Sequence, residues 1–407
     1  MVEVRISYGF DHVEVEIPDE RYAGSYEVTH PPKVNVAEIL EEALNNPIGD
    51  RLEEIKASSA LLVINDHTRL TPTETMLDHI LPRLKGKEIS TIVATGHHRA
   101  PTEEELRRIL GRYYGRLKII IHDARTSPSK YLGETSRGTP IEINEELFKY
   151  DLVVTLGSVE PHYFAGFTGG RKSIAPGVCG FRCIERNHML VLDPNSALAK
   201  LKGNPVHEDL EEIVREFSKY VRIFSLNVSI TGEGRPFAAA AGDIFESFYR
   251  LVGEVRKYYE IDPPHVEVVV AVAPGNMGVD LYQAQKALEP AKFLVKDGGV
   301  IVLVAPCRGG IGPRTFYDLL SGRSREEVWD IVKREFKLGY HKAVKILETL
   351  EKAKVFAVTD LDPEVIRNVG FEPFSDLQKA IEEAIRETDG RVIVLPEASI
   401  SIPRLSS

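Results

Sequence analysis

The chain has 407 residues, of which 43% are hydrophobic and 28% charged, and its formal net charge is −10. This length predicts two domains with a core each, and the composition is typical of a soluble globular protein. The negative charge argues against a nucleic-acid partner, because nucleic-acid binding requires a basic surface. No apolar run is long enough to span a bilayer, and the first residues do not resemble a secretion signal. We therefore expect a cytoplasmic protein with no membrane partner.

Strands and helices alternate along the first part of the chain. After a predicted hairpin within residues 2–17, buried strands are expected at residues 60–64, 89–94, 117–122 and 152–156. Helices are expected at residues 36–43, 73–84, 101–110, 205–219 and 243–259. This alternation predicts a mainly parallel sheet, in which ligands bind at the carboxyl ends of the strands.

The second part of the chain repeats the alternation after Asp262-Pro263-Pro264, where the prolines predict a linker. Its strands are expected at residues 266–272, 299–305, 355–358 and 391–395, and its helices at residues 324–336, 342–352 and 376–386. The predicted fold class is therefore α/β, with two domains of mainly parallel sheet at residues 1–262 and 263–395. We expect the active site in the cleft between them, and the tail at residues 396–407 to pack back on the first domain.

Polar residues follow three of the predicted strands. Asp66 and Arg69 come after the strand at 60–64, and His97 and His98 come after the strand at 89–94. Taken singly, each has a simpler interpretation: a surface ion pair for the first two, and helix-entry residues for the histidines. Lys286, in the second half, is by itself most simply a solvated lysine. Their joint position at strand ends favours a site, because converging cations suit a carboxylate or phosphate and imidazoles suit proton transfer.

The third segment, EPHYFAGFTGGRKSIAPGVCGFRCIERNH at residues 160–188, carries the densest chemistry. It nearly spells the phosphate-binding loop GxxxxGK[ST], but Arg171 stands where a glycine should let backbone wrap the phosphates. Pro176 and Gly177 also stop the helix that such a loop requires, so a nucleotidase is disfavoured. A lysine that binds pyridoxal phosphate stays possible, although no acid partner for it can be assigned. Cys179 and Cys183 are most simply incidental thiols.

Together these segments resemble the nickel-pincer lactate racemase family. The matching motifs are Asp66-His67-Thr68-Arg69, Thr95-Gly96-His97-His98-Arg99, Glu160-Pro161-His162, Gly169-Gly170-Arg171-Lys172, Asn187-His188 and Gln283-Ala284-Gln285-Lys286. They span most of the chain, and the neighbouring histidines at 97 and 98 leave a one-residue ambiguity. The resemblance implies a two-domain α/β fold and a tethered cofactor. That cofactor is nickel bound to a pyridinium-3-thioamide-5-thiocarboxylic acid mononucleotide.

The resemblance also implies roles for individual residues. Lys172 would hold the cofactor covalently, and His188 would bind nickel. His98 and His162 would be the acid–base pair. The residues implied to contact the substrate or shape its pocket are Arg69, Gln283, Lys286, Tyr282 and Asp66. Those implied to lie against the cofactor are Gly166, Gly169, Gly170 and Arg171.

The implied activity is racemisation or epimerisation of a small 2-hydroxy carboxylic acid of the lactate type. The hydrogen on C2 is a very weak acid, so its removal as hydride is favoured if the hydroxyl proton leaves to a histidine at the same time. Two histidines are needed because the hydroxyl lies differently in each enantiomer. Two alternatives stay open: a larger substrate such as malate, an aryl-lactate or a sugar acid, or a non-catalytic carrier of the metal–nucleotide. The sequence does not decide the oligomeric state.

Overall fold

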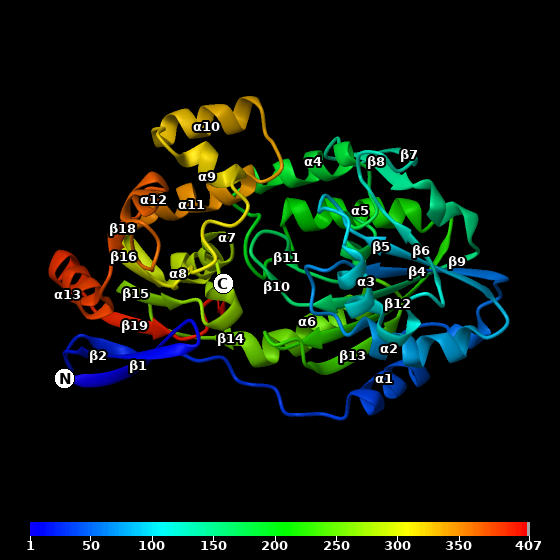
Figure 1. The fold of residues 1–407 in the computed structure, drawn as a ribbon, viewed down its shortest axis with the longest axis horizontal. Coiled ribbons are helices and arrows are strands. Elements are labelled where there is room, and N and C mark those ends of the chain that lie inside the picture. Colours follow the sequence, from blue (N-terminus) through cyan, green and yellow to red (C-terminus); the bar gives the residue numbers. More distant parts are fainter. Residues whose placement is uncertain (405–407) are drawn as a thin grey trace. The chain divides into compact units, whose positions relative to one another are not determined.

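The computed structural model describes residues 1–404, and the chain forms two compact units (Figure 1). The central unit comprises residues 31–258, and the terminal unit comprises residues 1–30 together with residues 259–404. The predicted boundary at residue 262 is close to the end of the central unit. The predicted first domain is wrong in its first 30 residues, however, because these pack on the terminal unit.

The core of the central unit is a six-stranded sheet in the order β13-β12-β9-β4-β5-β6. All neighbours are parallel except β13, which runs antiparallel to β12. The strands of the sheet are β4 (Ser59–Asn65), β5 (Glu88–Ala94), β6 (Lys118–Ile121), β9 (Leu152–Val159), β12 (Arg222–Ile230) and β13 (Pro236–Gly242). Two further ladders pair β7 (Ser129–Glu134) with β8 (Pro140–Asn144), and β10 (Pro161–His162) with β11 (Gly166–Phe167). The predicted parallel α/β sheet is confirmed.

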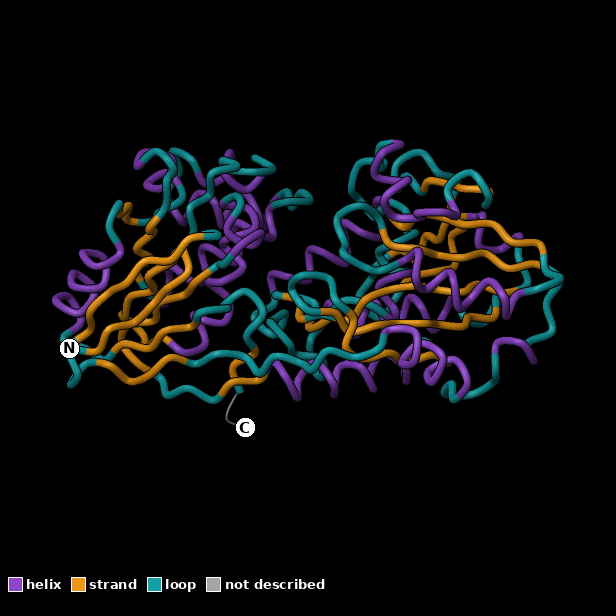
Figure 2. The backbone as a smooth tube through the Cα atoms, turned by 60° about the horizontal axis from the view of Figure 1, so that its bottom comes forward, coloured by secondary structure: helices purple, strands orange, loops and turns teal. Residues whose placement is uncertain are grey.

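Helices surround this sheet, and Figure 2 shows the strands enclosed by them. The α-helices are α1 (Val36–Asn45), α2 (Thr73–Ile80), α3 (Glu103–Leu110), α4 (Phe181–Met189), α5 (Pro205–Phe217) and α6 (Glu246–Tyr259). The 3-10 turns are η1 (Leu52–Glu54), η2 (Leu81–Leu84), η3 (Gly111–Tyr113), η4 (Glu145–Lys149), η5 (Gly170–Ser173) and η6 (Leu190–Leu192). Helix α3 begins two residues later than predicted, at Glu103, because Thr102 and Glu105 form a capping box. The pattern did not predict α4, since its polar residues hide the helical period.

The terminal unit contains a second six-stranded sheet, all parallel, in the order β18-β17-β16-β15-β19-β3. Its strands are β3 (Tyr22–Ser25), β15 (Val266–Val272), β16 (Val295–Val304), β17 (Lys354–Val358), β18 (Glu372–Phe374) and β19 (Val392–Leu395). Its α-helices are α7 (Leu281–Ala284), α8 (Leu288–Leu294), α9 (Thr315–Leu320), α10 (Arg325–Arg334), α11 (Tyr340–Lys352), α12 (Pro363–Asn368) and α13 (Leu377–Thr388), with the 3-10 turns η7 (Gly275–Gly278) and η8 (Gln285–Ala287).

The two chain ends join the terminal unit for identifiable reasons. The hairpin of β1 (Val2–Tyr8) and β2 (Asp11–Ile17) buries its apolar face in one core with β15, β16 and α13. β3 then extends the sheet beside β19. The tail does not follow its prediction either: β20 (Ile402–Pro403) pairs with β14 (Glu260–Ile261), which keeps it on the terminal unit. Within residues 1–404, no helix has the length and apolar character needed to cross a bilayer.

Candidate active site

Three polar segments lie at the carboxyl edge of the central sheet, as the sequence predicts. Asp66 follows β4, His97 and His98 follow β5, and Glu160 follows β9. β4 lies between β5 and β9, and all three strands are parallel. Their carboxyl ends therefore meet at one edge, where sheets of this kind bind ligands.

His98 is held by a buried carboxylate. Its Nδ1 lies 2.7 Å from Oδ2 of Asp66, which is 3% exposed. The other carboxylate oxygen accepts hydrogen bonds from the backbone N–H (3.1 Å) and hydroxyl (2.6 Å) of Thr68. Burial alone would raise the pKa of Asp66, but the bonds from His98 and Thr68 and the charge of Arg69 outweigh it and lower the pKa. Asp66 is therefore not part of a simple surface ion pair: it orients His98.

His97 belongs to the same cluster as His98. Its ring centroid lies 4.6 Å from that of His98 and 5.8 Å from that of His188. Desolvation by the surrounding protein, followed by the charge of His98 and, more weakly, of Lys172, lowers the pKa of His97 to about 4 against the opposing effect of Asp66. His97 is therefore a neutral imidazole that lies between His98 and His188. The sequence motif did not predict this position.

Phe164, which sequence reasoning did not single out, connects the other predicted groups. The centroid of its ring lies 4.6 Å from that of His162 and 5.4 Å from that of His188. Nζ of Lys172 lies 5.9 Å from the same centroid. Side chains from β10, η5 and α4 are thus brought together around one aromatic ring. An aromatic residue within a glycine-rich loop was the one available signal for it.

Lys172 lies in η5 and is partly exposed. Desolvation lowers its pKa well below the usual value, and the charges of Arg69 and Arg171 lower it further, while Glu160 opposes them. A shift in this direction favours the neutral amine over the ammonium. Because the neutral amine is the nucleophilic form, Lys172 suits covalent attachment of a cofactor.

His188 lies near the end of α4 and is 6% exposed. Burial lowers its pKa well below the usual value, and the neighbouring His97 and Lys172 add to the effect. The neutral imidazole that results is the form that binds a metal. Among residues 1–404, no group of three or more His, Cys, Asp or Glu side chains is placed to hold a metal ion. A metal on His188 would therefore need most of its donors from a cofactor, and the residues present fit a tethered one.

The glycines of the loop serve close packing of the protein on itself. A Cβ on Gly166 (φ +76°) would lie 2.3 Å from the carbonyl oxygen of Lys200, and one on Gly169 (φ +75°) would lie 2.7 Å from that of Ser158. Gly170 is enclosed in the same way. Contacts within the chain thus account for these glycines, and the expectation that they let backbone approach the cofactor stays a prediction.

Arg171 is bonded within the same loop, and its place against the cofactor stays a prediction. Its side chain is fully buried, and its guanidinium carbon lies 4.3 Å from the ring centroid of Phe248. Its terminal nitrogens donate to the carbonyl oxygens of Ala165 (2.9 Å) and Gly169 (3.4 Å). Burial lowers the pKa of Arg171 to about 9. The guanidinium is committed to the shape of the loop.

The remaining predicted residues lie together in the terminal unit. Tyr282 and Gln283 belong to α7, Lys286 belongs to η8, and all three are half-buried. Nζ of Lys286 donates to Oε1 of Gln283 at 2.6 Å, and Asp280 caps α7 through the backbone N–H of Gln283. Nζ of Lys342 lies 4.5 Å from the ring centroid of Tyr282. Lys286 is therefore fixed by a neighbour, unlike a freely solvated lysine.

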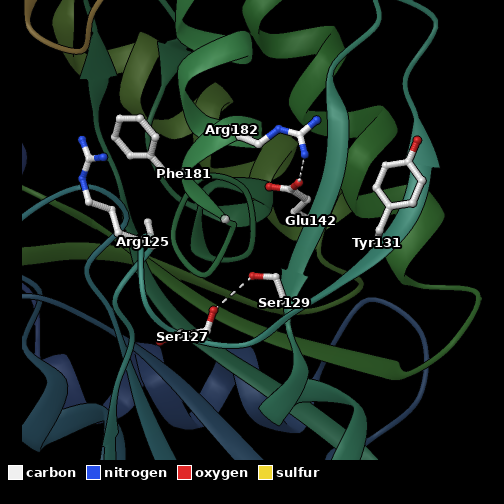
Figure 3. Close-up of a pocket in the computed structure, with 9 residues that line it drawn as sticks. Arg125, Ser127, Ser129, Tyr131, Glu142, Phe181 and Arg182 are labelled. Carbon is white, nitrogen blue, oxygen red and sulfur yellow. Dashed lines mark hydrogen bonds and ion pairs between the residues drawn. The ribbon is translucent and has the colours of Figure 1, made fainter.

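A separate pocket of about 400 Å³ lies at the amino end of α4 (Figure 3). The guanidinium of Arg125 stacks on the ring of Phe181, 3.5 Å from its centroid, and Arg182 pairs with Glu142 at 3.2 Å. None of the predicted site residues lines this pocket. Its charged groups are satisfied by one another or exposed, so it is distinct from the histidine cluster.

Comparisons with known families agree with the sequence motifs. The family model of the lactate racemase N-terminal domain matches residues 8–199, and the model of the lactate racemase C-terminal domain matches residues 261–402. A lactate racemase from Thermoanaerobacterium thermosaccharolyticum is 30% identical over 99% of this chain and 100% of its own length. A lactate racemase from Lactiplantibacillus plantarum is 30% identical over 98% of both chains.

Solved structures show the same similarity. The lactate racemase apoprotein from Thermoanaerobacterium thermosaccharolyticum matches with a TM-score of 0.92 at 28% identity, over 99% of this chain and 100% of that one. A protein from Thermotoga maritima matches with a TM-score of 0.68 at 17% identity, over 92% of this chain and 100% of its own. The second match concerns the fold alone.

Proposed function

The chain belongs to the lactate racemase family, a family of isomerases, and we propose on this premise that it interconverts the enantiomers of a small 2-hydroxy acid, with lactate as the first candidate. One observation carries the proposal: side chains from four segments gather around His97 and Phe164. They are His98, His162, Lys172 and His188.

The proposed cofactor is nickel bound to the pyridinium mononucleotide named above, attached to the amine of Lys172. Two features of the central unit support it: burial and nearby cations lower the pKa of Lys172, and burial with its neighbours lowers the pKa of His188, which favours the neutral form of each. Nickel accepts imidazole as a ligand, so His188 would bind it from the protein side. When bound, this group would supply reversible acceptance of a hydride from C2 of the substrate.

The protein's own part in catalysis is proton transfer at the substrate oxygen. Nε2 of His98 accepts the hydroxyl proton of one enantiomer, and the adjacent carboxylate of Asp66 stabilises the imidazolium that results. His162 exchanges the hydroxyl proton of the other enantiomer, whose oxygen points in the opposite direction. Transfer of the hydroxyl proton makes loss of hydride from C2 feasible, because the neutral alcohol is a poor hydride donor. Neither histidine removes the C2 hydrogen as a proton.

Three side chains are proposed to bind the substrate's carboxylate and oxygens. Arg69 lies at the carboxyl edge of the central sheet, near enough to Asp66 and Lys172 to shift the pKa of both. Gln283 and Lys286 are linked by their 2.6 Å hydrogen bond, which points the ammonium in a fixed direction. Cationic donors of this kind orient a carboxylate during the reaction.

A larger 2-hydroxy acid is the second candidate substrate. Backbone N–H groups of Leu281 and Tyr282 donate to the carbonyl oxygens of Gly310 (3.0 Å) and Ile311 (3.1 Å), so the loop at 307–313 is fixed against α7. That loop and the ring of Tyr282 would set the size of the pocket. A change of one methylene in such a pocket alters the preference between substrates only about 10- to 200-fold, so malate, aryl-lactates and sugar acids remain candidate substrates.

The test uses full-length protein prepared with and without the cofactor-synthesis system. Intact mass and nickel content report the adduct, and a chiral assay follows each pure enantiomer of lactate, malate, an aryl-lactate and a sugar acid. We expect an adduct on Lys172, nickel in proportion to it, and racemisation of at least one acid by the loaded protein alone. An adduct with no racemisation across the panel would favour the carrier, and racemisation without nickel would contradict the proposed cofactor.

A further inference from the structure

A chain of contacts links Arg171 to one of the two proposed acid–base histidines. Its Nη2 donates to the carbonyl oxygen of Ala165 at 2.9 Å, and its Nη1 donates to that of Gly169 at 3.4 Å. The guanidinium is also packed on the ring of Phe248. Because a guanidinium is planar and presents its donors in a rigid fork, it fixes the turn that follows His162 in a way that a flexible ammonium does not.

The same turn sets the position of the proton on His162. The backbone N–H of Ala165 donates to Nδ1 of His162 at 3.2 Å. A backbone amide nitrogen can only donate, so Nδ1 must accept and carries no proton itself. The neutral ring then has its proton on Nε2.

His98 has the opposite arrangement. Its Nδ1 lies 2.7 Å from a carboxylate oxygen of Asp66, and an ionised carboxylate can only accept. Nδ1 of His98 therefore carries the proton, and Nε2 keeps its lone pair. The two histidines are thus held as different tautomers, one by a side-chain carboxylate and the other by backbone.

We propose that Arg171 is a positioning residue that acts through Ala165 to hold His162 as its Nε2–H tautomer, opposite to the Nδ1–H tautomer of His98. The assignment of both histidines to the reaction rests on the proposed function. The tautomers themselves rest on the hydrogen bonds alone.

This difference has a consequence for the reaction. In the free enzyme, Nε2 of His98 presents a proton acceptor to the substrate, whereas Nε2 of His162 presents a hydrogen-bond donor. His162 can accept a proton at Nε2 only after its bond with the N–H of Ala165 is released and the ring proton moves to Nδ1. The loop held by Arg171 therefore controls how readily His162 exchanges the two roles.

The first test reads the histidine tautomers in the wild-type protein and uses substitutions only to assign the signals. Full-length protein is labelled with ¹⁵N on its histidine side chains, with and without cofactor, and the ring nitrogens are read by NMR. The variant His162→Gln identifies the signals of His162 by their loss, and His98→Gln identifies those of His98. We expect a protonated Nε2 on neutral His162 and a protonated Nδ1 on neutral His98 in the wild-type protein. A protonated Nδ1 on neutral His162 overturns the proposal.

The second test compares Arg171→Lys with Arg83→Lys. The substitution at 171 keeps an amine donor but loses the planar fork, while Arg83 is another little-exposed arginine that bonds to Glu41 and Asn45 outside the loop. We expect Arg171→Lys to move a measurable fraction of His162 to the Nδ1–H tautomer and to lower kcat about 10-fold, with KM changed less than about threefold. We expect Arg83→Lys to leave the His162 tautomer and the kinetic constants unchanged.

Two outcomes contradict the role of Arg171: an unchanged His162 tautomer in a folded Arg171→Lys protein, or an equal shift in Arg83→Lys. Intact mass of each variant reports whether Lys172 is still loaded, so a loss of kcat through poor loading is distinguished from one through His162. Because the NMR signals do not depend on turnover, they judge this inference even if the protein racemises none of the acids tested.

Discussion

Two lysines, Lys292 in the terminal unit and Lys172 in the central unit, show opposite pKa shifts. In the terminal unit, Nζ of Lys292 lies 3.0 Å from Glu289 and 2.7 Å from Glu348. Burial would lower the pKa of Lys292, but these carboxylates outweigh burial and raise it. Lys345, which is 3% exposed, binds the same Glu348 at 2.9 Å. In the central unit, by contrast, the pKa of Lys172 falls well below the usual value.

Desolvation disfavours the charged amine in both places, so the neighbouring charges decide the difference. Lys292 faces two carboxylates and stays charged, which ties α8 to α11. Lys172 is near Arg69 and Arg171, and the carboxylate of Glu160 does not offset them. A lysine whose pKa is raised by carboxylates stabilises the fold as a cation, whereas a lysine whose pKa is lowered is more reactive as a nucleophile. Charge environment, more than burial, distinguishes a structural lysine from a functional one.

The largest expected effect comes from Lys172→Met, which keeps the side chain's length and removes the amine. We expect no covalent adduct in the intact mass and no detectable racemisation, because the tether and the cofactor are lost together. Thermal unfolding should stay close to that of the wild type, since burial favours the neutral form of this amine and its removal costs less than breaking a buried ion pair. A variant that still carries the adduct would place the tether on another residue.

Asp66→Asn is expected to have the next largest effect. It removes the charge that fixes the Nδ1–H tautomer of His98 and stabilises its imidazolium, so kcat should fall about 10²- to 10⁴-fold with a smaller change in KM. Rates are measured from each enantiomer separately. Since enantiomers have equal free energies, kcat/KM must agree in the two directions, which provides an internal check on the assay.

The matched control for this carboxylate is Thr68→Val. It removes the hydroxyl that donates to Asp66 at 2.6 Å but leaves the charge and the 2.7 Å contact with His98. We expect kcat to fall less than about 10-fold, in line with the loss of one hydrogen bond. If Asp66→Asn has no greater effect than Thr68→Val, then Asp66 does not orient the histidine.

The local sequence was sufficient to predict the strands and the position of their polar ends. Buried runs such as residues 60–64 and 89–94 end within four residues of Asp66 and His98, and parallel order in the sheet then brings these side chains together. The family motifs added the tether and the metal ligand, which spacing alone does not distinguish from an ordinary lysine and histidine.

Features that depend on distant segments could not be predicted. Gly166 is required by the carbonyl of Lys200, and the direction of Arg171 is decided by Phe248, each far along the chain. Residues 1–30 join the terminal unit because β3 finds an open sheet edge beside β19, which periodicity within 1–30 does not encode. The prediction for the tail was wrong for the same reason, because its strand β20 pairs with β14, which lies far from it in the sequence.

The smallest effect on activity is expected from Lys292→Met, the counterpart of Lys172→Met in the terminal unit. It leaves Glu289 and Glu348 with Lys345 as their remaining buried cation, so the free energy of unfolding should fall by about 2–3 kcal/mol. Adduct formation and kcat should match the wild type, as measured by intact mass, denaturant unfolding and the chiral assay.

Lys296→Met provides the exposed control, because Lys296 pairs with Glu267 at the surface with 48% of its side chain accessible. Its loss should change stability by less than about 1 kcal/mol. If Lys292→Met prevented the adduct while leaving stability intact, the neighbouring carboxylates would not mark a structural lysine. We expect Lys292→Met to lose stability and keep the adduct, and Lys172→Met to lose the adduct and keep stability. That pair of results would show that the two lysines differ through the charges around them.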